Sequence, residues 1–217
     1  MARSNRPIKI LVALAALAGL AFLFVRSARD SRANPYTVPR AQLQGWTVGI
    51  EPASSPNAPL LVLNAPPELS SGIFNQVFAR AMESLSMPVP AAIPLLLKRE
   101  FDQAFAGHLT PDALVTAARD AGLESSALQP RCMAYRRAST AERTRQLYFV
   151  LFDAPAFGAF RQKIGGLLEA GSKNRADYDP AALSPALLVA ASDTEFNLWL
   201  PIKADPATDC VAPIQGD

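Results

Sequence analysis

The side chains best suited to catalysis are few in this chain and stand apart in the sequence. His108 is the only histidine, so any pairing of a serine or cysteine nucleophile with a histidine base would have to use it. It lies two residues before Thr110, a typical helix N-cap, and the sequence contains no G-x-S-x-G nucleophile elbow. We therefore interpret His108 as a loop residue between two helices.

The acidic residues give no stronger catalytic signal. Asp153 follows an apolar, strand-like segment and precedes Ala154 and Pro155, which is more typical of a helix N-cap than of a catalytic acid. Asp177 and Asp179 flank a tyrosine, but a calcium-binding loop needs more oxygen ligands at fixed spacing. With one histidine and no acidic cluster, the sequence predicts no metal site, no cofactor and no nameable catalytic residue.

Cys132 and Cys210 are the two cysteines of the chain. Neither belongs to a C-x-x-C motif, which argues against thioredoxin-like chemistry and against a structural zinc. In an exported protein two such cysteines typically pair. We predict a Cys132–Cys210 disulfide that holds the C-terminal tail onto a sheet. The alternative is two unrelated thiols, one of them buried.

Five arginines gather in one predicted β-hairpin, where only Glu142 opposes them nearby in the sequence. They form the densest cationic patch outside the N-terminus. Such a patch could contact anionic lipid headgroups, an acidic envelope protein or a polyanionic envelope polymer. The alternative is an edge hairpin that its charges keep soluble. The five residues are Arg131, Arg136, Arg137, Arg143 and Arg145.

The N-terminal segment predicts where these residues are located. Residues 10–25, ILVALAALAGLAFLFV, are uncharged and apolar, and Lys9 and Arg26 flank them with side chains long enough to reach lipid headgroups. As a helix the run would span about 24 Å, against a hydrocarbon core of about 30 Å. We predict an uncleaved signal-anchor helix in the lipid bilayer. A cleaved signal peptide is less favoured, because the small residues that could form its cleavage site, Ser31 and Ala33, follow a charged stretch. The third interpretation is a buried core helix.

Charge is divided unevenly between the anchor and the body. The chain has 21 basic and 19 acidic residues, a net charge of +2, but residues 1–33 contain six of the basic residues and one acid. The remaining 15 basic and 18 acidic residues give the body a net charge of −3, which argues against nucleic acid as a partner. Three basic residues on each side of the apolar run leave its orientation undecided, and the cysteines favour an extracytoplasmic body. The abundance of arginine and alanine is typical of a bacterial source.

The hydrophobic pattern predicts an α+β fold, in which a mainly antiparallel sheet packs against helices. Residues 1–9 form a basic flank, 10–25 the transmembrane helix and 26–43 a linker. Residues 44–203 form one globular domain, and 204–217 a loose tail that a disulfide at Cys210 would tether. Strands are predicted at 46–50, 60–63, 131–137, 145–152, 186–191 and 195–202, and helices at 73–85, 97–105, 111–121 and 155–171.

These features predict a single-pass membrane protein with a periplasmic domain that acts by binding, as an envelope accessory or interaction module. One alternative is an envelope hydrolase or transferase, which would need a deep pocket with an acid beside His108 or Asp153. Another is a small-ligand carrier with an apolar cavity under the helices, although core packing explains the candidate lining more simply. That lining would be Phe74, Phe78, Phe101 and Phe105. The oligomeric state is not predicted.

Overall fold

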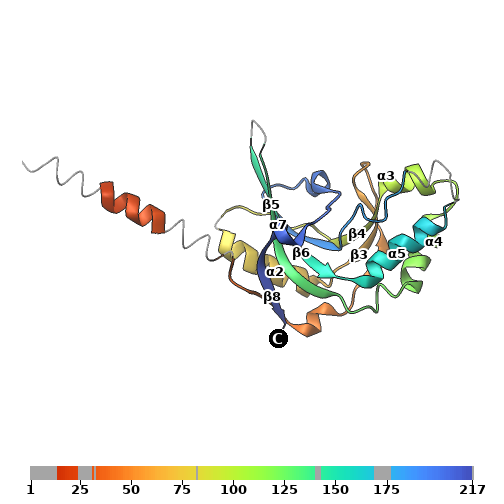
Figure 1. The fold of residues 1–217 in the computed structure, drawn as a ribbon, viewed down its shortest axis with the longest axis horizontal. Coiled ribbons are helices and arrows are strands. Elements are labelled where there is room, and N and C mark those ends of the chain that lie inside the picture. The colour runs from red at the N-terminus through yellow and green to blue at the C-terminus, as the bar shows by residue number, and fades with distance from the viewer. Residues whose placement is uncertain are drawn as a thin grey trace, which may run out of the picture.

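The computed structural model describes residues 14–23, 31, 33–81, 83–139, 143–168 and 177–216. They form a mixed α+β fold built on a five-stranded sheet, in the order β1-β8-β5-β6-β7, and a three-stranded sheet, in the order β2-β3-β4 (Figure 1). Neighbouring strands are antiparallel except for β1 and β8, which are parallel. The predicted α+β class with a mainly antiparallel sheet is confirmed. The strands are β1 (Tyr36–Val38), β2 (Thr47–Ile50), β3 (Pro59–Asn64), β4 (Ala92–Leu97), β5 (Gln129–Ser139), β6 (Thr144–Asp153), β7 (Ala186–Ala191) and β8 (Cys210–Gly216).

Helices cover both sheets. Helix α2 packs against β1 and β7, and α4 lies beside α5 at the opposite end of the molecule (Figure 1). The α-helices are α2 (Pro67–Ala81), α3 (Lys98–Glu100), α4 (Pro111–Asp120), α5 (Pro155–Gly166) and α7 (Pro206–Asp209). Shorter helical turns are η1 (Arg40–Leu43), the π-helical η2 (Phe101–Phe105) and η3 (Phe196–Trp199).

The described part of the predicted anchor is residues 14–23, which are helical. No helix among the described residues combines the length and the apolar character needed to span a bilayer. Lys9 and Arg26, the predicted membrane flanks, lie outside the described residues. The transmembrane helix therefore stays a prediction.

Two elements follow their local sequence signals closely. In α4 the Thr110 hydroxyl accepts a hydrogen bond from the Ala113 amide at 3.2 Å, and Pro111 occupies the first turn, as predicted. Gly122 has φ +75°, the left-handed conformation expected just after the helix end. Strand β6 is buried from Leu147 to Phe152 and lies between β5 and β7, which explains why both of its faces are apolar.

A buried ion pair joins α5 to the region where β4 meets α3. The side chain of Arg161 is fully buried, and its Nη2 donates to Glu100 Oε1 at 2.7 Å. The same guanidinium donates to three backbone carbonyls, at 2.8 Å each: those of Leu95, Asp179 and Pro180. Glu100 Oε2 in turn accepts the Leu97 amide at 2.9 Å. These bonds satisfy both charged groups, which burial requires.

The sheet extends beyond the predicted bounds of the domain. Strand β1 lies within the predicted linker and pairs with β8, which lies within the predicted tail. The tail is ordered because several contacts hold it: Asp205 caps α7 through the Ala207 amide at 2.9 Å, and β8 pairs with β5. The prediction of a loose tail was wrong.

The predicted strand at 195–202 is also wrong, because Phe196–Trp199 forms the helical turn η3. Asp193 Oδ1 accepts the Glu195 amide at 2.9 Å, which begins a turn, and Pro201 has no amide to donate to a sheet. Conversely, β4 was not predicted. Its Pro94 is tolerated because β4 is the edge strand of the small sheet, and the predicted helix at 97–105 begins only after β4 ends at Leu97.

Candidate functional site

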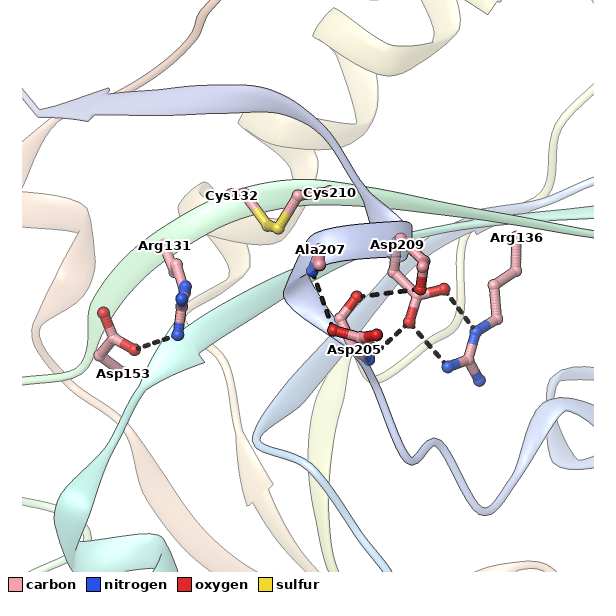
Figure 2. Close-up of a disulfide and its surroundings, with 9 residues drawn as sticks. Arg131, Cys132, Arg136, Asp153, Asp205, Ala207, Asp209 and Cys210 are labelled. Atoms are coloured by element: carbon pink, nitrogen blue, oxygen red, sulfur yellow. Dashed lines mark hydrogen bonds and ion pairs between the residues drawn. A yellow bond between two sulfur atoms is a disulfide. The ribbon is translucent and has the colours of Figure 1, made fainter.

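The predicted disulfide is present and joins two neighbouring strands. Cys132 lies on β5 and Cys210 begins β8, with a Cα–Cα distance of 5.7 Å (Figure 2). The bond lies at a shallow cleft of about 560 Å³, whose walls include Arg131, Pro206 and Pro213. A disulfide of this kind suggests that the domain folds in an oxidising, extracytoplasmic compartment.

Two of the five hairpin arginines flank the disulfide, and each faces an acid. Arg136 binds Asp209 through two hydrogen bonds, Nε to Oδ1 at 3.0 Å and Nη2 to Oδ2 at 2.8 Å. Arg131 Nη1 lies 3.5 Å from Asp153 Oδ1, and both of these side chains are exposed. Figure 2 shows the two pairs on opposite sides of the disulfide.

Two more arginines pair with acids from the segment after β7. Arg145 donates to both oxygens of Asp193, at 2.6 and 3.1 Å, and its guanidinium lies 5.1 Å from the centre of the Trp199 ring. Arg143 Nη2 donates to Glu195 Oε2 at 2.6 Å. Arg137 is exposed and forms no ion pair with the described residues.

The arginine patch is therefore largely neutralised from within the fold. Sequence proximity pointed to Glu142, which lies outside the described residues, as the only nearby acid. The fold instead brings Asp193, Glu195 and Asp209 to the hairpin from distant positions, and Asp153, at the end of β6, faces Arg131 within the hairpin. Arg136 and Arg145 are partly buried in their ion pairs and support structure here, whereas the side chains of Arg131, Arg137 and Arg143 are exposed.

Two of these ion pairs lower the pKa of the carboxyl group that takes part in them. The hydrogen bonds from Arg136 lower the pKa of Asp209 below its usual value, and those from Arg145 lower the pKa of Asp193 in the same direction. A carboxyl group whose pKa is lowered by folding stabilises the fold above the unfolded-state pKa, about 3.9. That contribution is lost as the pH falls through the folded-state pKa.

We predict that the free energy of unfolding falls as the pH drops below about 4. Asp209→Asn should be less stable than the wild type at neutral pH, and its stability should depend less on pH between about 4 and 2. Urea unfolding of both chains from pH 7 to pH 2.5 measures this. Asp153→Asn is the matched control, because an exposed pair contributes only about 0–1 kcal/mol. Parallel pH profiles for wild type and Asp209→Asn would contradict the prediction.

The candidate catalytic residues do not meet. His108 is exposed in the turn after η2, where its amide donates to the Phe105 carbonyl at 2.9 Å. The prediction that Asp153 is the N-cap of α5 is wrong. Ala154 holds that position, and Asp153 faces Arg131. Asp179 accepts the Ala181 amide at 2.8 Å within its own loop. Within the described part of the chain, no three His, Cys, Asp or Glu side chains converge as a metal site would require.

The four phenylalanines proposed as cavity lining do not surround a described cleft. Phe74 and Phe78 stack on each other along α2, with ring centres 5.9 Å apart. Phe105 is buried and packs edge-on against Tyr178, with ring centres 5.0 Å apart, and Phe101 is partly buried against the same core. Phe74, Phe101 and Phe105 therefore pack against the core, whereas Phe78 is 51% exposed.

A different cleft, of about 680 Å³, opens on the outer face of the small sheet. Side chains alternate along β3, so Leu61 and Leu63 join the core whereas Val62 faces the cleft, opposite Pro94 of β4. Residues 51–59, 87–90 and 194–200 contribute the surrounding walls, and Leu188 of β7 completes them. Sequence reasoning missed this site because four separated segments build it.

The lining of this cleft is mostly apolar but not uniformly so. Five of the lining residues are prolines, and the exposed rim includes Val89 and Leu198, which are 84% and 59% exposed. Among the described residues of the lining, the charged ones are Glu51 and Glu195, and Glu195 is paired with Arg143. Neither His108 nor Asp153 belongs to it. The volume lies within the usual range of ligand sites, about 300–1,000 Å³. A mostly apolar lining with a few polar groups is also typical of such sites.

No protein-family model, no curated protein and no solved structure is significantly similar to this chain. Any functional assignment therefore rests on the residues and their geometry.

Proposed function

We propose that this chain is a membrane-anchored, extracytoplasmic domain that acts by binding, and that the cleft on the small sheet is its binding site. Residues 10–25 would hold it in the bilayer, and the Cys132–Cys210 disulfide supports an oxidising compartment on the extracytoplasmic side. The observation that carries the binding function is the cleft itself.

Solvent-exposed apolar side chains at the rim of a concave, mostly apolar surface are typical of an interaction site. Val89 and Leu198 have this position, on two different walls. The arginine hairpin is a weaker candidate contact for an anionic partner, because four of its five arginines already face an acid of the fold.

The alternative of an envelope hydrolase or transferase loses support. It required an acid beside His108 or Asp153 in a deep pocket, and those two side chains are exposed and outside the cleft. A small-ligand-binding function stays compatible with the cleft, although not with the four phenylalanines first considered for it.

Site-specific photo-cross-linking in native membranes tests the proposal. We expect a benzophenone amino acid at position 89 to give discrete adducts, and the added substitution Leu198→Asn to reduce their yield at least fivefold by placing a polar group on another wall of the same cleft. Leu167→Asn is the matched control, because Leu167 is 56% exposed, like Leu198, but lies outside the cleft lining. Absence of adducts, or equal loss with both substitutions, would contradict the proposed site.

A further inference from the structure

We infer that the ligand of this cleft is a polypeptide segment in which apolar side chains flank a lysine or arginine, and that Glu51 is the counter-charge for the basic residue. This inference rests on the proposed function, since it names the partner of the same site.

The charge of the cleft selects a cationic ligand. Of its two carboxylates, Glu195 is already bound to Arg143 at 2.6 Å. Glu51 is only partly buried and forms no ion pair with the described residues. Because the described lining contains no basic residue and the body has a net charge of −3, a cation beside Glu51 meets attraction and an anion meets repulsion.

The polar side chains of the lining favour a peptide over an acyl chain. Ser54, Ser55, Thr194 and Asn197 line the cleft, and their side chains make no hydrogen bond within the described structure. An acyl chain would remove these groups from water without replacing their hydrogen bonds, which is costly. A peptide brings amide donors and carbonyl acceptors of its own.

The prolines explain why those four polar side chains matter. Pro52, Pro59, Pro88, Pro90 and Pro94 have no amide proton, so large parts of the walls cannot donate a backbone hydrogen bond to a ligand. Their rings instead offer rigid apolar surface for the ligand's aliphatic side chains. Recognition would therefore combine apolar packing on the exposed Val89 and Leu198, side-chain hydrogen bonds at the rim and one ion pair at Glu51.

The test selects phage-displayed random heptapeptides on the full chain in detergent micelles. We expect enriched sequences to contain one lysine or arginine among apolar residues. A synthetic selected peptide, titrated by fluorescence anisotropy, should bind Glu51→Gln about fivefold more weakly than the wild type, as expected for a partly exposed ion pair. Glu68→Gln is the matched control, because Glu68 lies in the exposed first turn of α2, outside the cleft lining, and should leave the affinity unchanged.

Three outcomes would overturn the inference. They are enriched peptides without a basic residue, an affinity that Glu51→Gln leaves unchanged, and no selected peptide while a fluorescent dodecanoic acid binds the cleft, which would identify an acyl ligand. In each case, photo-cross-linked adducts at position 89 whose yield falls with Leu198→Asn would still support the proposed function. If those adducts are also absent, the proposed function fails together with the inference.

Discussion

Replacing Arg161 by methionine should lower the free energy of unfolding by about 3–5 kcal/mol, because it leaves the buried Glu100 carboxylate without its counter-charge. Methionine preserves much of the length of the side chain, so the loss reports mainly on the missing charge and hydrogen bonds. The carbonyls of Leu95, Asp179 and Pro180 lose their donor as well. Urea unfolding followed by the fluorescence of Trp46 and Trp199 measures the change.

Two further variants make this result specific. Arg119→Met removes an arginine from an exposed pair with Glu124, and it should cost about 0–1 kcal/mol. Glu100→Gln retains an oxygen that can accept from Arg161 but leaves the buried guanidinium without its counter-charge, so it should also be strongly destabilising. A similar loss for Arg119→Met and Arg161→Met would mean that burial of the ion pair does not determine its contribution.

The elements that the sequence predicts well are those with local signals. Helix α4 has a capping residue, a proline in its first turn and a glycine just after its end, and each acts within a few residues. Strand β6 is a continuous apolar run of the length of a buried strand. The disulfide followed from the number of cysteines and the expected compartment, since two cysteines allow only one intramolecular pair.

The elements that the sequence predicts badly depend on partners that are distant along the chain. Strand β8 contains Pro213 and Gln215, which argue against a central strand, yet it lies between β1 and β5 because the disulfide and the Arg136–Asp209 pair hold it there. For the same reason the sequence did not reveal the acids that face the arginine patch. Asp209 is 73 residues from Arg136 and Asp193 is 48 from Arg145, so no local window shows the neutralising charge. The cleft likewise exists only once β3, β4, β7 and η3 are assembled.

Breaking the Cys132–Cys210 disulfide should lower the free energy of unfolding by about 4 kcal/mol in the chain-entropy model. The two cysteines are 78 residues apart, so the bond removes a long loop from the unfolded ensemble. Because β8 also pairs with β1, weakening its hold on β5 should loosen β1 too. Urea unfolding with and without tris(2-carboxyethyl)phosphine measures the effect.

The double variant Cys132→Ser with Cys210→Ser is the control for the reductant. It should be as unstable as the reduced wild type, and adding reductant should not change it further. Equal stability of the oxidised and reduced wild type would show that the strand pairing of β8 and the Arg136–Asp209 pair just before it hold the strand without the disulfide.

Labelling of the two cysteines with a membrane-impermeant maleimide in intact cells would show in which compartment the domain lies. If the domain is extracytoplasmic, the cysteines of unlysed cells should react only after reductant is added, because the oxidised pair offers no thiolate. If they are free without reductant and react only after lysis, the body lies in the cytoplasm. The anchor would then have the opposite orientation, and a partner for the cleft would have to be sought among cytoplasmic proteins.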